Sequence, residues 1–284
     1  MVRNMKVIRE NKTVNINFFL FKIHCNELDK ILYKSTNQIQ YCKEVKKVTV
    51  SLVWYTLEGI GKEKFKEIYS EYKQEVGKIG EISLDVTIDN LSEQEEDTIY
   101  FEFQHDFKHS TKIRGNLIEY PYSHEAKFWT IFTQNKNYLL ISGKEESIKF
   151  LVGKLVKICS DEHINQGEMR QILIKPLELT PEHMAKIINK DAISVNTRWF
   201  NDLGERETTA GLYGNLEDEH GNRSPYYDKF LKEAKNSPYI NFLSETLGYN
   251  IGISTQKFSS NKKEATYESF VDYFKDIILA EINL

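Results

Sequence analysis

The stretch KVTVSLVWYTL, residues 47–57, carries the clearest strand pattern of the chain, and its neighbours are interpreted relative to it. Val48, Val50, Leu52 and Trp54 occupy every second position, and side chains two positions apart lie on the same face of a β-strand. β-branched and aromatic residues also suit the pleated, half-buried surface of a sheet. We therefore predict a strand over 47–57.

The segments on both sides of this strand alternate between strand and helix patterns. They predict strands over 14–23 and 81–89 and helices over 26–35 and 61–76. The acidic, polar run 89–98 is expected to be a loop. Residues 1–97 are therefore predicted to form an N-terminal α/β lobe.

The remainder, residues 98–284, shows the order strand, strand, helix, strand, helix twice. The first pass is predicted as a hairpin over 127–142, a helix over 144–160, a strand over 168–179 and a helix over 180–190. The second is predicted as strands over 192–200 and 206–216, a helical stretch over 224–247, a strand over 248–258 and a helix over 266–282. Two such ββαβα passes indicate either a tandem repeat or a common way of covering one face of a sheet. The predicted fold class is α+β, a mostly antiparallel sheet with helices packed on one face.

Composition narrows the class of protein. The chain has 284 residues, of which 40% are hydrophobic and 12% aromatic, enough for a globular protein with a substantial core. The formal net charge of −4 excludes a basic field over the whole chain, so any contact with nucleic acid would be local.

The cysteines and the apolar runs bear on the compartment. The three cysteines, Cys25, Cys42 and Cys159, include no close pair, so the sequence indicates neither a disulfide framework nor a CxxC metal site. The apolar run at 18–21 is too short for a signal peptide, and no window reaches membrane-spanning length. We expect a cytoplasmic protein that does not bind membranes.

The most polar stretch is GLYGNLEDEHGNRSPYYDKF, residues 211–230, which contains Glu217, Asp218, Glu219 and His220. Neighbouring side chains in a loop diverge, and a calcium loop starting at Asp218 would need a closing glutamate where Lys229 stands. We therefore interpret these residues as a polar turn through Gly221, followed by a helix that starts at Ser224 and Pro225. As an exposed acidic loop, residues 217–220 are a candidate contact for a basic partner; metal binding or catalysis is the alternative.

Two other stretches resemble known site patterns incompletely. HDFKH, residues 105–109, places two histidines four apart as in the HExxH zinc helix, but Asp106 replaces the glutamate and the context favours a strand. His105 and His109 then share a strand face, and we expect a surface pair or, alternatively, a metal site. GIGKEKF, residues 59–65, has too few glycines for a phosphate loop and indicates a tight turn or an anion contact at a helix start.

No catalytic constellation is evident. The sequence contains no GxSxG elbow and no dinucleotide-binding fingerprint. A nuclease core with an acid followed by acid-x-Lys would begin at Asp85 or Asp89 and continue at Glu102, but residue 104 is Gln. We assign no catalytic residue, no metal ligand and no cofactor.

Basic and aromatic residues interleave in places. The candidate nucleic-acid contacts are Lys108, Lys112, Arg114, Arg198, Trp199 and Arg206. Cations beside exposed rings on a sheet surface hold single strands by stacking and phosphate contact. This interpretation requires the cations to converge on one groove.

The sequence leans towards a protein that is not an enzyme. We predict a binding or assembly subunit of a microbial multi-protein complex, with a protein partner. One alternative is a component of a defence or nucleic-acid-handling system that binds single-stranded nucleic acid. Another is an enzyme, nuclease-like, whose residues come from separated positions.

Overall fold

The computed structural model describes residues 2–9, 12–19, 49–113, 115–165, 172–203 and 209–282, the first two ranges as backbone only. The chain divides into two compact units, Met1–Lys46 and Lys47–Leu284. In the first unit β1 (Val2–Arg9) pairs antiparallel with β2 (Lys12–Phe19), with Val2 opposite Phe19. The strand predicted over 14–23 overlaps β2, whereas the helix predicted over 26–35 lies outside the described residues.

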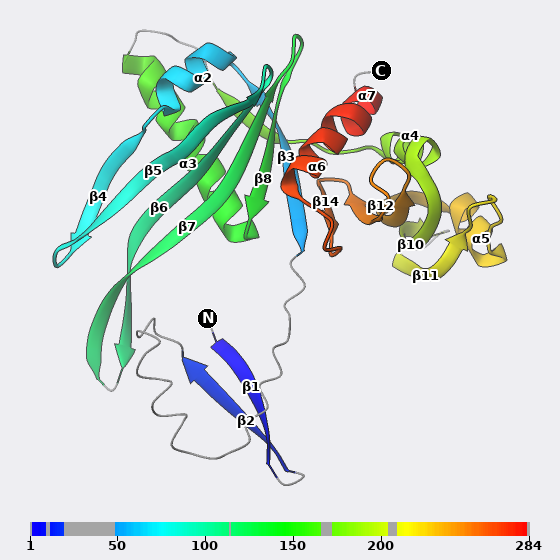
Figure 1. The fold of residues 1–284 in the computed structure, drawn as a ribbon, viewed down its shortest axis with the longest axis horizontal. Coiled ribbons are helices and arrows are strands. Elements are labelled where there is room, and N and C mark those ends of the chain that lie inside the picture. Colours follow the sequence, from blue (N-terminus) through cyan, green and yellow to red (C-terminus); the bar gives the residue numbers. More distant parts are fainter. Residues whose placement is uncertain are drawn as a thin grey trace. The chain divides into compact units, whose positions relative to one another are not determined.

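The second unit is built on one large sheet whose paired strands are all antiparallel (Figure 1). Its strands are β3 (Val50–Glu58), β4 (Lys73–Ile79), β5 (Ile82–Glu95), β6 (Thr98–Ile113), β7 (Asn116–Phe132), β8 (Asn137–Gly143), β9 (Leu173–Pro176), β10 (Ala192–Leu203), β11 (Thr209–Glu217), β12 (Ala234–Ser244), β13 (Asn250–Ser254) and β14 (Lys257–Ser260). The order is β11-β10-β12-β13-β14-β3-β8-β7-β6-β5-β4, and β9 also pairs with β3. The strand predicted over 47–57 is thus β3, which joins the two halves of the sheet.

Within the described residues the helices are α2 (Lys62–Tyr69), α3 (Glu145–Asn165), α4 (Pro181–Asp191), α5 (Pro225–Glu233), α6 (Tyr267–Tyr273) and α7 (Leu279–Ile282), with a π-helical turn, η1 (Phe274–Ile278), between the last two. The predicted starts of α4 and α5 are confirmed. The Thr180 and Ser224 side chains accept hydrogen bonds from backbone N–H groups of the first turn, and a proline follows each cap. These caps satisfy donors that would otherwise have no partner.

The helices pack on both faces of the sheet. On β3, Leu52 and Trp54 belong to a core that includes residues of α4, α6 and η1, whereas Tyr55 and Leu57 face a second core that includes residues of α2 and α3. Successive residues of a strand point to opposite faces, so the two cores lie on opposite sides of β3. The predicted α+β class therefore fits only loosely: the fold is sheet-dominated, and helices on one face alone are not confirmed.

Several predicted elements have other boundaries. The helix predicted over 61–76 ends at Tyr69, because Glu71 adopts a positive φ of 55° and the chain continues as β4. Most of the loop predicted over 89–98 is strand. Residues 234–244 form β12 and not a helix; Pro238 lacks the N–H that a helix interior needs, and Ile240 and Phe242 alternate into the core.

The predicted strand over 248–258 is the hairpin β13–β14. The second ββαβα pass therefore has β12, β13 and β14 between α5 and α6, where the described residues of the first have β9 between α3 and α4. The lobe boundary predicted between residues 97 and 98 falls at the turn between β5 and β6, and it stays a prediction. No helix within the described ranges is long and apolar enough to cross a membrane.

Candidate functional site

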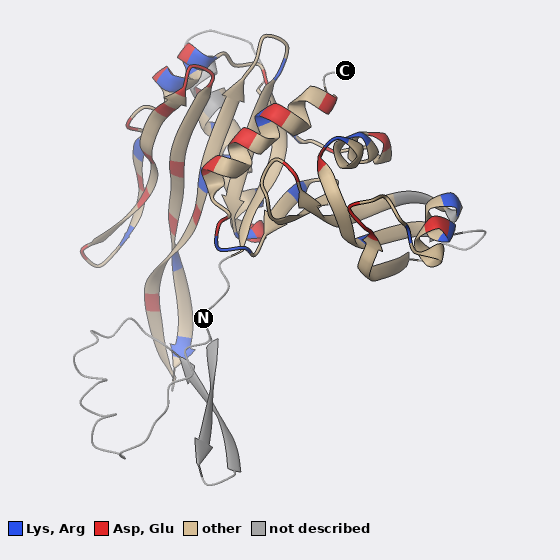
Figure 2. Cartoon of the chain, turned by 45° about the vertical axis from the view of Figure 1, so that its right-hand side comes forward, with Lys and Arg blue, Asp and Glu red and all other residues tan. Residues whose placement is uncertain are grey.

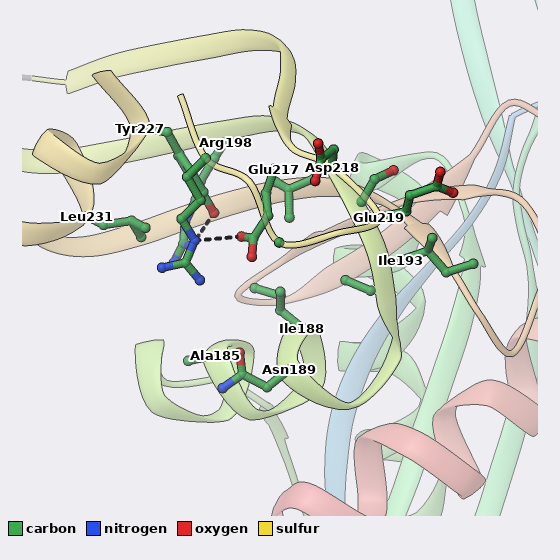
Figure 3. A pocket seen from close by; sticks show the side chains of 15 residues that line it. Ala185, Ile188, Asn189, Ile193, Arg198, Glu217, Asp218, Glu219, Tyr227 and Leu231 are labelled. Atoms are coloured by element: carbon green, nitrogen blue, oxygen red, sulfur yellow. Dashed lines mark hydrogen bonds and ion pairs between the residues drawn. The ribbon is translucent and has the colours of Figure 1, made fainter. Parts of the chain in front are cut away.

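A pocket of about 390 Å³ opens between β10, α4, α5 and the turn that follows β11 (Figure 3). It brings together residues that the sequence suggested for different purposes. Arg198 of β10 lines it, as do Glu217, Asp218 and Glu219 of the acidic turn. The pairing of β10 with β11 explains this, because Val195 lies opposite Glu217 in the sheet.

Arg198 is held in place by neutral groups. Its Nε donates a hydrogen bond to Ser237 Oγ and its Nη1 donates to Tyr227 Oη, both at 2.9 Å. The centre of the guanidinium lies 5.4 Å from the Phe200 ring centroid and 5.8 Å from that of Tyr227, within the range of cation–π attraction. No carboxylate of the described chain forms an ion pair with Arg198, so the positive charge of this half-buried residue has no counter-ion there.

The acidic turn is largely occupied by its own hydrogen bonds. Asp218 Oδ1 accepts from the backbone N–H groups of His220 and Asn222, and Oδ2 accepts from Asn222 Nδ2, all at 2.9 Å. The Asn222 side chain is the main cause of the lowered pKa of Asp218. This is the Asx-type arrangement that stabilises turns.

The other residues of the turn divide between pairing and exposure. Glu217 Oε2 accepts from Arg223 Nε at 3.1 Å, and this hydrogen bond is the first cause of the raised pKa of Arg223. Glu219 and His220 are exposed, with His220 Nε2 3.7 Å from Glu219 Oε1. Among the described residues, no group of three or more His, Cys, Asp or Glu side chains is arranged to hold a metal ion.

A second candidate is the outer part of the β6–β7 hairpin, which we call the arm (residues 106–113 and 116–125). β6 pairs with β5 only as far as His105, and β7 pairs with β8 only as far as Ala126. Beyond these points the two strands pair only with each other, out to Ile113 and Asn116. Figure 1 shows the arm extending past the ends of the neighbouring strands.

One face of the arm and its base carries a continuous row of rings, which we call the ring stripe. Directly opposite pairs are His105 with His124, Phe107 with Tyr122, and His109 with Tyr120. Their ring centroids are close: 5.0 Å for Phe107–Tyr122 and 5.1 Å for His109–Tyr120. The stripe is buried at His105, half-buried along most of its length and exposed at His109.

Helix α3 anchors the inner end of the ring stripe. The Phe150 centroid lies 5.0 Å from that of His105 and 4.7 Å from that of His124, and His124 Nδ1 is 3.0 Å from Ser147 Oγ. Burial is the main cause of the lowered pKa of His105, with Lys154 acting in the same direction. His105 and His109 thus share a face, as predicted for a strand, but their surroundings differ.

The predicted nucleic-acid contacts occupy two separate parts of the sheet. Lys108 and Lys112 lie on the face of the arm opposite the ring stripe, and Lys108 Nζ lies 2.6 Å from Glu119 Oε1. Arg198 and Trp199 lie on β10, beyond β7, β8, β3, β14, β13 and β12 in the strand order. The four described residues therefore do not converge on one groove, and Arg114 and Arg206 lie outside the described residues.

Residues of the phosphate-loop-like stretch 59–65 and of the nuclease-like pattern interact with other partners. Lys62 Nζ lies 3.5 Å from Glu93 Oε2 and also donates to the Glu96 carbonyl oxygen. Asp89 and Glu102 are paired across β5 and β6, but Glu102 accepts hydrogen bonds from Tyr100 and Asn90, and the first of these is the main cause of its lowered pKa. Asp85 Oδ2 pairs with Lys73 Nζ at 3.1 Å.

Sequence reasoning missed an exposed aromatic face, in which the exposed rings of Trp199 and Tyr213 adjoin the half-buried Tyr239. Trp199 lies opposite Tyr239 across β10 and β12, and its ring centroid is 6.3 Å from that of Tyr213. A Cβ on Gly211 would lie 3.1 Å from the Tyr213 ring, and one on Gly252 would lie 2.4 Å from Tyr239 Oη. The side chains of both tyrosines therefore lie over glycines, a signal visible only once the strand pairing is known. No protein-family model and no curated protein matches this chain.

Proposed function

We propose that this chain is a non-catalytic binding protein that assembles with a protein partner through the ring stripe of the arm. The observation that supports this best is the arm itself. A two-stranded ribbon is marginal in water by itself, yet here it extends beyond its neighbouring strands and carries rings along one face. Such a surface gains stability when a partner covers it.

The local energetics fit this role. Cross-strand aromatic pairs contribute roughly 0.2–1 kcal/mol each, so Phe107–Tyr122 and His109–Tyr120 help to keep the arm formed before it binds. At the tip, Ile113 adds apolar surface on the face of the ring stripe and is 37% exposed, whereas Leu117, 60% exposed, pairs with Lys112 and lies on the opposite face. The partner therefore meets a surface that is already ordered, which lowers the entropy cost of association.

The charge of the arm favours protein over nucleic acid. Over residues 106–125 the three basic residues Lys108, Lys112 and Arg114 are balanced by Asp106, Glu119 and Glu125. Figure 2 shows both signs on the arm. Phosphate binding draws its affinity from an excess of cations, and the arm has none.

The proposal is tested by comparing the two faces of the arm in affinity purification from the native host. The stripe variant Phe107→Ser/Tyr120→Ser removes rings from one face, and the control Lys112→Ser/Glu119→Ser changes the opposite face equally often. We expect a stoichiometric partner to be retained by wild type and control and lost by the stripe variant. Retention by all three, with unchanged thermal unfolding, would remove the arm from the function.

The exposed aromatic face favours single-stranded nucleic acid as a second candidate function. Trp199 is 38% and Tyr213 66% exposed, and rings on an open sheet face stack on bases. The test is a titration with labelled single-stranded oligonucleotides at two salt concentrations, using wild type and Trp199→Ala. Binding that weakens in the variant supports the candidate, and no binding at low salt removes it.

A further inference from the structure

We propose that the pocket beside Arg198 binds a small aliphatic carboxylate, whose anionic end pairs with the Arg198 guanidinium. This inference is independent of the proposed partner binding by the arm. Figure 3 shows Arg198 and Tyr227 on one side of the pocket, Glu217 beside them, and α4 with Ala185 and Ile188 below. The pocket volume of about 390 Å³ lies in the range of small-ligand sites, roughly 300–1,000 Å³.

The hydrogen bonds of Arg198 use only part of its guanidinium. A guanidinium has about five N–H donors in a fixed plane, and the described residues take up its Nε and one Nη1 donor only. Ser237, which accepts from Nε, itself donates to the Trp199 carbonyl oxygen at 2.7 Å. These hydrogen bonds fix the plane of the guanidinium. Its remaining N–H donors match the two oxygens of a carboxylate.

The other charged side chains around the pocket do not neutralise Arg198. Arg223 is paired with Glu217, and Asp218 accepts three hydrogen bonds within its own turn. Arg198 is thus the lining cation whose charge no described carboxylate balances. Burying a charge costs free energy unless a counter-ion or water compensates it. An anionic ligand would supply that counter-ion.

The other residues that line the pocket indicate which kind of anion fits. Ala185, Ile188, Val195 and Leu231 contribute apolar side chains, which favour a ligand with an aliphatic body. Asp218 and Glu219 at the rim disfavour a second negative charge, because like charges at close range repel. A monocarboxylate fits these surroundings better than a phosphate or a dicarboxylate.

The proposal is tested by calorimetric titration of the full chain with 4-methylpentanoate, with its primary amide and with inorganic phosphate. We expect the carboxylate to bind, and the amide and phosphate to bind at least about tenfold more weakly, because charge-assisted hydrogen bonds are about twice as strong as neutral ones. No binding of the carboxylate, or equal binding of acid and amide, would overturn the proposal without involving any variant.

Variants assign the contact to Arg198. Arg198→Gln should weaken binding of 4-methylpentanoate about tenfold or more, and Tyr227→Phe should weaken it less because it only loosens the guanidinium. Lys186→Gln, the same charge change on α4 outside the pocket lining, should leave binding unchanged. Equal loss in Arg198→Gln and Lys186→Gln would overturn the assignment.

A titration with peptides distinguishes the two possible sources of such a carboxylate, a free small molecule and the C-terminus of a peptide. Tripeptides ending in leucine are titrated with a free or an amidated C-terminus. Tighter binding of the free acid than of either peptide supports a free small ligand. Binding of the free-terminus peptide alone would overturn it and identify a peptide C-terminus as the ligand.

Discussion

The arm and the pocket both contain aromatic rings and basic side chains, but these are in contact in the pocket and lie on opposite faces in the arm. In the pocket, Arg198 is enclosed by Tyr227, Phe200 and Ser237, so aromatic rings serve to position a charge. In the arm, the rings lie in a row on one face and the cations on the other, where Lys108 is paired with Glu119. The elements packed against a strand therefore decide its chemistry. With α4 and α5, part of β10 becomes a concave site, whereas the arm is anchored by α3 only at its inner end and further out its strands pair only with each other.

Strand β3 connects the part of the sheet that carries the arm with the part that holds the pocket. Trp54 is fully buried and stacks on Phe258, with a centroid distance of 5.7 Å. Trp54→Ala should lower the free energy of unfolding by about 3–5 kcal/mol, the largest effect that we predict. Chemical denaturation measures it, and a loss below about 1 kcal/mol would contradict the central position of β3.

A change confined to the region of α4 should leave the arm unaffected. Asp191 is buried and accepts from Ser244 Oγ at 2.6 Å, Tyr273 Oη at 2.8 Å and the Thr246 N–H at 2.8 Å. Asp191→Ala leaves these donors without an acceptor, at a cost of about 3 kcal/mol. Hydrogen exchange should accelerate in α4 and β12 but not in residues 106–125; equal acceleration in both regions would show that they are not independent.

A substitution in α3 should affect the arm and leave the pocket unchanged. Phe150 packs against His105 and His124 from α3. Phe150→Ala should cost about 1–2 kcal/mol because the side chain is only partly buried. Amides of the arm should exchange faster while binding at the Arg198 pocket stays unchanged, and protection of the arm identical to wild type would separate the ring stripe from α3.

The smallest predicted effect is a pH dependence at the base of the arm. In the folded state, burial lowers the pKa of His105 below its ordinary value of 6.5. As the pH falls, His105 is therefore protonated in the unfolded chain before it is protonated in the folded chain. The contribution of His105 is therefore complete above about pH 6.5 and is lost below it. The midpoint of thermal unfolding should differ less between pH 7.5 and pH 5.5 in His105→Leu than in wild type. An equal difference in both proteins would exclude His105 as the source of the pH dependence.

Local patterns predicted much of the fold. Period-two alternation located β3, and the Thr180-Pro181 and Ser224-Pro225 pairs located the starts of α4 and α5. The predicted helix over 224–247 is wrong beyond Glu233, because the apolar residues around Pro238 change from helical spacing to the alternation of a strand, β12. The strand predicted over 81–89 is also too short, because β5 continues to Glu95. A polar sequence is compatible with a strand when one of its faces is exposed.

The candidate sites were less predictable, because pairing between distant segments creates them. Arg198 and the acidic turn were both noted in the sequence, but they share a pocket only because β10 pairs with β11. The ring stripe alternates visibly at Phe107 and His109 and again at Tyr120 and Tyr122, on either side of Gly115. That symmetry is the signal from which a hairpin with one aromatic face was predictable.

The role of the arm is tested most directly by site-specific photo-crosslinking in the native host. A benzoylphenylalanine is placed at Tyr120, on the ring stripe, or at Lys112, on the opposite face. We predict that position 120 yields one dominant protein adduct and that position 112 yields little of it. Equal labelling from both faces, or no adduct at position 120 in a chain that folds normally, would contradict the assignment of the ring stripe as the partner surface.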